Sequence, residues 1–284
     1  METVFNTAKL RVIVAEWRRN GERIAFVPTM GNLHDGHISL LRHARETAER
    51  TVVSIFVNPI QFGKGEDYAK YPSTLEADQE KLMRLELDVL FAPNLKELYP
   101  AGIEEDTRVT VPSLSNILCG EFRADHFTGV ATVVTKLFFS VQPDYAFFGE
   151  KDLQQLMVIR RMADDLCIPI EIVGKPIIRE DDGLAMSSRN SYLNAAEREI
   201  APIIHQTLQI AGVDAADPAA DFRKIEETCF AHLRNSGFKP EYFSIRRSND
   251  LLEANRNDRE LSILTAAWLG NARLIDNIQV SLHE

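Results

Sequence analysis

The sequence predicts an α/β protein with a parallel sheet covered by helices on both faces, followed by a smaller α+β domain. Over the first part of the chain, short apolar runs rich in β-branched residues alternate with segments of helical apolar spacing. The polar stretch REDDGLAMSSRN then interrupts this alternation. With 284 residues, 45% of them hydrophobic, the chain is long for one compact domain. We therefore predict two domains, residues 1–176 and 177–284.

The elements of the larger domain follow in the order typical of a Rossmann-like fold. Strands are predicted at residues 23–29, 51–57, 89–92 and 145–148, and helices at residues 36–50, 74–86, 130–141 and 152–166. Ligands of open parallel sheets bind outside the carboxyl ends of the strands. Candidate site residues are therefore sought just after Thr29, Val57 and Phe148.

The smaller domain has a different pattern. Two predicted helices, residues 195–211 and 219–235, precede three predicted strands, residues 242–245, 261–267 and 272–278. Helices followed by a run of strands favour a small α+β arrangement.

Charge and composition exclude several classes of protein. The formal net charge of −10 and the pI near 5.3 disfavour general binding of a nucleic-acid backbone. No segment has the length and apolarity of a membrane span or signal peptide. The three cysteines, Cys119, Cys167 and Cys229, are far apart and are expected to be buried free thiols. We therefore expect a cytoplasmic protein with no nucleic-acid or membrane partner.

The segment PTMGNLHDGHISLL, residues 28–41, is the most informative one. It leaves a strand, crosses a glycine-containing turn and enters a helix with His34 and His37 three positions apart, so both imidazoles can lie on one face near the first turn. Free backbone N–H groups and the helix dipole favour anions there, which predicts a triphosphate site. The alternative is a zinc pair. The zinc motif HExxH, however, needs a spacing of four with an intervening glutamate, and here Asp35 and Gly36 intervene.

Two further segments follow strand ends. FVNPIQFG places Gln61 after the second strand, and its carboxamide can both donate to and accept from a ligand. FFGEKDLQQL places Lys151 where it could meet phosphate charge, with Asp152 and Gln155 on one helix face. Read alone, FVNPIQFG is better explained as a capped strand end with a surface glutamine, whereas FFGEKDLQQL is as compatible with helix capping as with a functional role.

The segment LAMSSRNSYL, residues 184–193, opens the second domain. This loop could close over a triphosphate, with Ser187, Ser188 and their N–H groups as donors and Arg189 as a permanent positive charge. The alternative is a polar linker with no ligand.

Together these segments carry a specific resemblance. HDGH and MSSRN resemble the HIGH and KMSKS signatures of the nucleotidyltransferase superfamily that includes class I aminoacyl-tRNA synthetases. Within it, PTMGNLHDGHISL, FVNPIQF, DYAKYP, RADHFTGVATVVTKLF, FGEKDLQQ and LAMSSRNSYL resemble pantothenate synthetases, in the order of that family. The resemblance implies an ATP-dependent ligase that forms pantoyl adenylate and pyrophosphate, and then transfers the pantoyl group to β-alanine with release of AMP. It also suggests a homodimer.

The resemblance further implies roles for individual residues. His37 would donate a proton to the leaving group, with His34, Lys151 and Arg189 as further catalytic residues. ATP contacts would come from Met30, Gly31, Asn32, Leu33, His34, Asp35, Gly36, His37, Gly149, Glu150, Lys151, Asp152, Ile178, Met186, Ser187, Ser188 and Arg189. Gln61 and Gln155 would hold pantoate, and Gln61 also β-alanine. Mg²⁺ would bridge ATP oxygens, with Asp78 as the candidate protein ligand.

Three other functions remain possible on the sequence. A simple nucleotidyltransferase would also release pyrophosphate but would not release AMP in response to an amine. An aminoacyl-tRNA synthetase is disfavoured by the acidic charge and by the lack of a recognisable anticodon-binding domain. A regulator that has lost catalysis would have a damaged motif, whereas His34, His37, Lys151 and Arg189 are all present.

Overall fold

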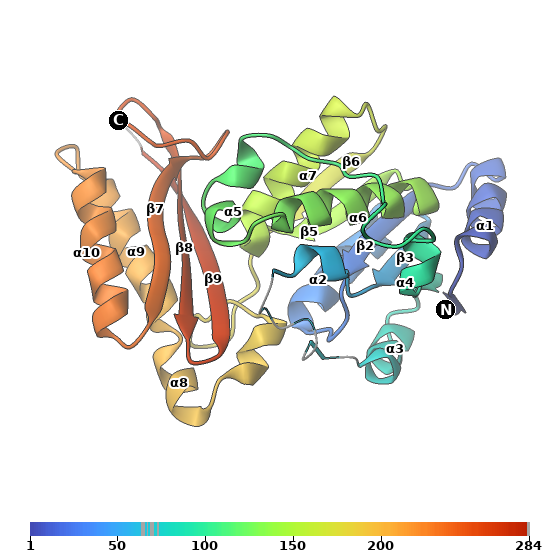
Figure 1. Ribbon diagram of the computed structural model, residues 1–284, viewed down its shortest axis with the longest axis horizontal. Coiled ribbons are helices and arrows are strands. Elements are labelled where there is room, and N and C mark those ends of the chain that lie inside the picture. Colours follow the sequence, from blue (N-terminus) through green and yellow to red (C-terminus); the bar gives the residue numbers. More distant parts are fainter. Residues whose placement is uncertain (64–65, 67, 69–70, 73, 283–284) are drawn as a thin grey trace. The chain divides into compact units, whose positions relative to one another are not determined.

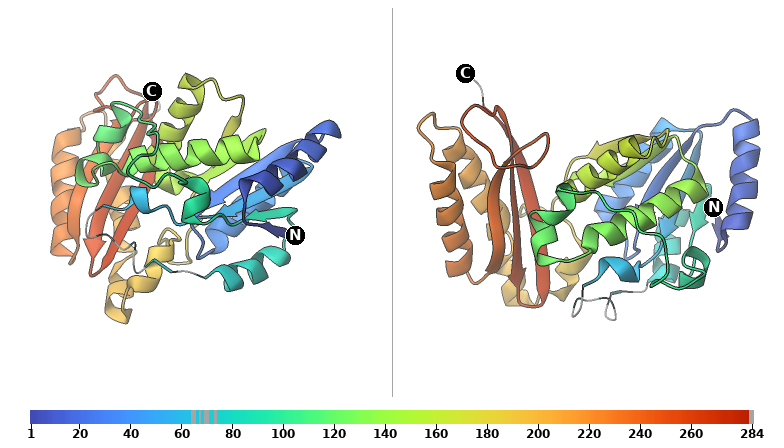
Figure 2. Two further views of the ribbon diagram at one scale, coloured as in Figure 1. Left: turned by 45° about the vertical axis from the view of Figure 1, so that its right-hand side comes forward. Right: turned by 45° about the horizontal axis from the view of Figure 1, so that its top comes forward.

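A computed structural model describes residues 1–63, 66, 68, 71–72 and 74–282. Asp67, Ala69 and Lys70 of the DYAKYP segment lie outside these described residues. The chain forms two compact units, residues 1–150 with 155–176, and residues 151–154 with 177–284. Figures 1 and 2 show the elements of each unit. We further predict that residues 1–176 bind the nucleotide and pantoate, and that residues 177–284 carry the loop that closes over the triphosphate.

The first unit contains a six-stranded parallel sheet, which confirms the predicted α/β fold class. The strand order is β1-β4-β3-β2-β5-β6. The strands are β1 (Glu2–Val4), β2 (Ile24–Thr29), β3 (Arg50–Ile55), β4 (Val89–Phe91), β5 (Tyr145–Gly149) and β6 (Glu171–Lys175). From β2 the chain builds outward through β3 and β4 and then returns to place β5 on the other side of β2. The strand order therefore reverses between β2 and β5, where open sheets bind ligands.

Helices cover both faces of this sheet because successive strand side chains point to opposite sides. Ala25 and Val27 of β2 pack with Leu41 of α2 (Asp35–Thr47) and Leu82 of α3 (Leu75–Met83). On the opposite face, Phe26 meets Phe138 of α6 (His126–Val141) edge-on, with ring centroids 6.4 Å apart. The other helices of this unit are α1 (Thr7–Arg19), α4 (Leu95–Leu98), α5 (Cys119–Phe122) and α7 (Leu153–Asp165).

The second unit contains a three-stranded antiparallel sheet, β7 (Lys239–Arg247), β8 (Glu260–Leu269) and β9 (Ala272–Ser281). Helices α9 (Ile203–Ala215) and α10 (Phe222–Asn235) lie side by side against it in Figures 1 and 2, and share its apolar core. The helix predicted at residues 195–211 is two helices, because α8 (Ala195–Ile200) ends just before Pro202 and α9 begins just after it.

The three cysteines and the apolar character of the helices can be compared with the sequence predictions. Cys119 and Cys229 are buried free thiols, but Cys167 is exposed, which corrects the prediction that all three are buried. Cys167 lies in the turn after α7 with φ +52°, where the chain leaves the packed helix face. None of the helices among the described residues combines the length and the apolar character needed to cross a membrane.

Candidate active site

The loop that joins β2 to α2 carries the predicted histidine pair at the carboxyl end of a central strand. Gly31, with φ +83°, and Asn32, with φ +50°, turn the chain sharply after Thr29. The Thr29 hydroxyl secures the turn, because it donates to the Ser54 carbonyl at 2.7 Å and accepts the Gly31 N–H at 3.2 Å. The chain then enters α2 with His34 as the N-cap residue.

His34 and His37 cap this helix with each other. The Nδ1 atom of His34 accepts the Gly36 N–H at 3.2 Å, and Nδ1 of His37 accepts the His34 N–H at 3.3 Å. The arrangement is a capping box in which imidazoles replace the usual Ser or Thr and Glu. The ring centroids are 4.1 Å apart, so the two imidazoles lie side by side at the start of α2.

Gly36 is required by this close packing of rings. A Cβ atom at position 36 would lie 2.9 Å from both Cε1 and Nδ1 of His34. Any larger residue would therefore displace the His34 ring from its capping position. The glycine between the histidines thus has a local steric reason in addition to its place in the motif.

Backbone N–H groups in this loop are not available to an anion as the sequence suggested. Those of Gly31, Asn32, Leu33, His34, Gly36 and His37 all bond to acceptors within the loop or on residues 74 and 78. The expectation of free N–H groups is therefore wrong for these six residues, because the histidine side chains, the backbone of the loop and the side chains of residues 74 and 78 accept from them. Phosphate recognition by this segment would therefore rely mainly on side chains.

Asp78 of α3 is one of those acceptors, and it is only 1% exposed. Its Oδ2 accepts the Asn32 N–H at 2.8 Å and the Thr74 hydroxyl at 3.0 Å, and its Oδ1 accepts the Leu33 N–H at 2.8 Å. A carboxylate occupied in this way on both oxygens does not match an Mg²⁺ ligand, which must face the metal. The structure does not support the expectation that Asp78 binds Mg²⁺.

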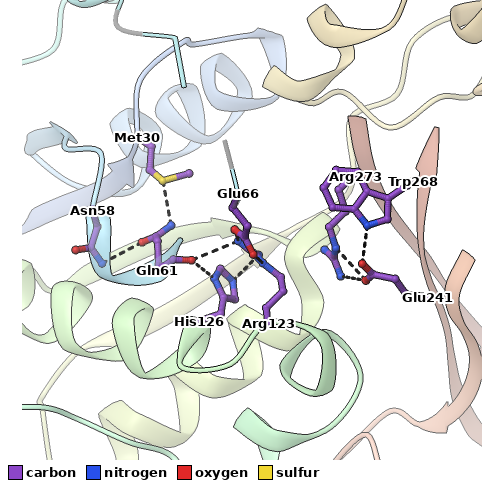
Figure 3. Close-up of polar contacts among 9 residues, drawn as sticks. All are labelled: Met30, Asn58, Gln61, Glu66, Arg123, His126, Glu241, Trp268 and Arg273. Carbon is purple, nitrogen blue, oxygen red and sulfur yellow. Dashed lines mark hydrogen bonds and ion pairs between the residues drawn. The ribbon is translucent and has the colours of Figure 1, made fainter. Parts of the chain in front are cut away.

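Gln61 follows β3 in a short 3-10 turn, Pro59–Gln61, and is 8% exposed (Figure 3). Its carboxamide accepts from Asn58 Nδ2 at 3.3 Å and donates to Met30 Sδ at 3.0 Å. The Tyr99 hydroxyl donates to Asn58 Oδ1 at 2.8 Å, and burial raises the pKa of Tyr99, which keeps it a donor. This chain of hydrogen bonds directs the Gln61 amide nitrogen toward Met30.

The main chain of Gln61 is held as firmly as its side chain. His126 Nδ1 donates to the Gln61 carbonyl at 2.7 Å, and Arg123 donates to the same oxygen at 3.3 Å while pairing with Glu66. A Cβ atom on Gly129 of α6 would lie 2.7 Å from the Gln61 nitrogen. The motif RADHFTG contains three of these residues, but no role could be assigned to any of them from sequence alone.

The residues predicted after β5 divide between the two units. Gly149 and Glu150 belong to the first, whereas Lys151 and Asp152 group with the second. Lys151 Nζ lies 3.4 Å from Asp152 Oδ2, and the Lys151 carbonyl accepts from Asn277 Nδ2 of β9 at 3.0 Å. Gln155 is half-buried on α7.

The segment predicted to close over ATP is a short hairpin in the second unit. Arg179 and Ala185 form an isolated β-bridge, and the Met186 N–H donates to the Ile178 carbonyl at 2.9 Å. Ser187 caps the following 3-10 turn, Ser188–Tyr192, because its hydroxyl accepts the Arg189 N–H at 3.3 Å. The predicted residues of this loop therefore lie together on one supported turn.

A buried ion pair supports the base of this hairpin. Arg179 donates to both oxygens of Asp276 at 2.7 and 2.9 Å, and the Asp276 side chain is fully buried. Arg179 also donates to the Gly183 carbonyl at 3.0 Å and to the carbonyl of Asn277 at 3.3 Å. Since Asn277 also contacts Lys151, β9 brings two of the predicted site segments together within the second unit.

Comparison with known proteins agrees with this arrangement. The family model for pantoate-beta-alanine ligase matches residues 2–279. A pantothenate synthetase from Pseudomonas putida strain W619 is 52% identical over 284 residues, covering 100% of this chain and 99% of the relative. One from Marinobacter nauticus is 50% identical over 281 residues, covering 99% and 100%.

Two crystal structures share the whole fold. The pantothenate synthetase of Thermus thermophilus has a TM-score of 0.90 and 43% identity, covering 98% of this chain and 99% of that one. The pantoate-beta-alanine ligase of Francisella tularensis, complexed with beta-gamma ATP and beta-alanine, has a TM-score of 0.83 and 35% identity, covering 98% and 97%. These matches confirm the family resemblance found in the sequence. The chain belongs to the pantoate–β-alanine ligase family.

Proposed function

We propose that the reciprocally capped pair of His34 and His37 binds the phosphates of ATP in the adenylation step of this family's reaction. The observation that carries the proposal is the pair of adjacent imidazoles, each fixed by a backbone contact, at the point where the strand order reverses. Donors fixed in advance stabilise charge that develops during a reaction without having to reorganise.

The reaction joins pantoate to β-alanine in two steps. A pantoate carboxylate oxygen attacks the α-phosphorus of ATP, the bond to pyrophosphate breaks, and pantoyl adenylate forms. The β-alanine amine then attacks the pantoyl carbonyl, and AMP leaves. Neither step needs a protein nucleophile, so binding geometry and charge stabilisation provide the catalysis.

Each predicted site residue has a place in this proposal. His37 donates a proton toward the leaving pyrophosphate, and Lys151 and Arg189 offset its charge. The remaining nucleotide contacts come from the residues around them, which are Met30, Gly31, Asn32, Leu33, Asp35, Gly36, Gly149, Glu150, Asp152, Ile178, Met186, Ser187 and Ser188. The N–H groups of Gly31, Asn32 and Leu33 already bond within the protein. Contacts from this loop to ATP are therefore proposed to come mainly from side chains.

Gln61 and Gln155 are proposed to hold pantoate, and Gln61 also β-alanine. The fixed direction of the Gln61 carboxamide supports this, since its amide nitrogen can donate to a ligand oxygen. The Francisella tularensis relative is complexed with beta-alanine and beta-gamma ATP, which supports both ligand classes for this chain.

We also propose that Mg²⁺ arrives on the triphosphate and keeps most of its water ligands. Across the described ranges, no group of three or more His, Cys, Asp or Glu side chains could hold a metal ion, and Asp78 is already occupied. The residues therefore do not fit a metal site built by the protein alone. A homodimer and a cytoplasmic location are proposed on the family resemblance only.

Replacement of His37 by alanine tests the central role. We expect the rate of pantoate-dependent ATP–pyrophosphate exchange to fall about 10²- to 10⁴-fold, the range typical of a positioned proton donor. An exchange rate near that of the wild type would remove His37 from catalysis. The overall reaction is checked by AMP and pantothenate appearing together only when pantoate and β-alanine are both present.

The pantoate pocket is tested separately. Gln61→Ala should raise the KM for pantoate well above its wild-type value while leaving the KM for ATP nearly unchanged. Gln79→Ala, on α3 with a side chain that contacts Thr3, provides the control. Equal changes in both KM values would contradict the placement of pantoate at Gln61.

A further inference from the structure

Helix α3 and the residue before it present three polar side chains to the loop that carries the histidine pair. Thr74, Asp78 and Lys81 are spaced by four and then three residues, so they lie on one helix face. Thr74 accepts the Asn32 N–H at 3.1 Å, and Lys81 donates to the Leu33 carbonyl at 2.5 Å. Asp78 lies between them and contacts both residues of the loop.

Asp78 fills a position that an anionic ligand could otherwise occupy. The N–H groups of Asn32 and Leu33 are consecutive and converge on one carboxylate, with Asn32 in the left-handed region. Such converging N–H groups form a concave site for anions, as in phosphate-binding loops. Here the anion is a buried side chain of the protein itself, and it fixes the loop before any nucleotide binds.

We propose that Asp78 is a positioning residue for adenylate formation. Its carboxylate holds Asn32 and Leu33, which immediately precede His34, and thereby sets where the imidazole pair meets the triphosphate. Since the His34 ring caps α2 only while the loop has this conformation, loss of the carboxylate displaces both rings together. The inference rests on the proposed roles of His34 and His37.

The test is Asp78→Asn, which keeps the shape of the side chain but replaces an accepting oxygen with a donating NH₂ group. We expect kcat for pantoate-dependent ATP–pyrophosphate exchange to fall about 10²-fold, as small misplacements of catalytic groups do. The KM for pantoate should stay near its wild-type value because Gln61 is held by Asn58, His126 and Arg123 instead. Hydrogen exchange at the Asn32 and Leu33 amides should become faster.

Asp88→Asn is the matched control. Asp88 also accepts a backbone N–H, that of Thr51 at 2.8 Å, but it lies at the amino ends of the strands. Its replacement should lower stability without changing the exchange rate or the amides of Asn32 and Leu33. Equal losses of rate in the two variants, or a wild-type rate in folded Asp78→Asn, would overturn the inference.

Two further measurements distinguish the positioning role from metal binding and from a failure to fold. If Asp78 instead bound Mg²⁺, Asp78→Asn would raise the Mg²⁺ concentration needed for half-maximal rate, and excess Mg²⁺ would restore activity, which overturns the positioning role. If Asp78→Asn does not fold, the same measurements are made on Thr74→Val and Lys81→Met. Smaller losses of kcat are expected for these two variants. His37→Ala distinguishes the two proposals, because a normal rate there refutes the histidine roles rather than the contact made by Asp78.

Discussion

The two loops proposed to meet ATP are supported in different ways. In the first unit, residues 30–37 are held directly, since the buried Asp78 accepts the backbone N–H groups of Asn32 and Leu33. In the second unit, the buried Asp276 acts through Arg179 at the base of the hairpin. One aspartate therefore contacts its loop directly, while the other reaches its loop through an arginine, so we expect the first to affect mainly activity and the second mainly stability.

The largest expected effect is a loss of stability in the second unit, which tests the difference between the two loops. Asp276→Asn leaves Arg179 without its charge partner, and losing one member of a buried pair costs about 3 kcal/mol or more of the free energy of unfolding. Trp268 of β8, whose indole donates to Glu241 at 2.7 Å (Figure 3), reports on the second unit. Trp17 of α1 reports on the first.

Urea unfolding of single-tryptophan variants measures the two units separately. The transition reported by Trp268 should move to lower urea in Asp276→Asn, and that reported by Trp17 should move less. The variants Trp17→Phe and Trp268→Phe without the Asp276 change are the controls. Transitions that move equally would contradict an effect confined to the second unit.

Two glycine substitutions, one in each loop, test whether activity and stability are affected separately. Gly36→Ala places a Cβ 2.9 Å from the His34 ring, but alanine favours a helix start, so we expect roughly a 10-fold loss of exchange activity with little change in stability. Gly183 has φ +92°, and a Cβ there would meet His205 Cδ2 at 2.9 Å, so Gly183→Ala should cost about 1–3 kcal/mol of stability. Thermal melts and exchange-rate assays check both variants. A loss of stability in Gly36→Ala together with a loss of activity in a stable Gly183→Ala would contradict the difference between the two loops.

The smallest expected effect is a pH dependence in the second unit. His205 Nδ1 lies 3.7 Å from Asp276, yet burial and then Arg179 lower the pKa of His205 below its ordinary 6.5, against the opposing effect of Asp276. The unfolded chain therefore binds a proton more readily, so His205 contributes stability above pH 6.5 that is lost as pH falls toward the lower folded pKa.

Thermal midpoints between about pH 7.5 and 5 test this dependence. The difference in midpoint between wild type and His205→Asn should shrink as the pH falls, because the variant lacks the titrating ring. His232→Asn, in the last turn of α10, is a control that should follow the wild-type curve. A difference that stays constant with pH would contradict the assignment.

Strands with continuous apolar sequence were predictable from the sequence because they are buried on both faces. β2 and β3 were placed correctly on that basis, and β5 likewise. Strand β6, EIVGK, was not predicted, since it lies at an edge and its residues are mostly half-buried or exposed, with no apolar run to mark it. Pro202 was the available signal for the break between α8 and α9.

Local motifs located the candidate site but not its supports. The spacing of His34 and His37 correctly predicted that both rings lie near one helix start. The contact from Asp78 to Asn32, in contrast, spans 46 positions, and that from Arg179 to Asp276 spans 97. No periodicity in a single sequence records contacts of that length, so both aspartates acquired their roles only from the fold.

The occupied N–H groups of the histidine loop limit how the motif can be transplanted. The segment HDGH, placed on another strand and helix, would lack the acceptors that Thr74 and Asp78 provide to Asn32 and Leu33. Those amides would then turn to water or to a bound phosphate, and the loop would relax. The functional unit is consequently discontinuous, HDGH together with TxxxDxxK on a separate helix, and an engineered ligase that borrows one part would have to borrow the other.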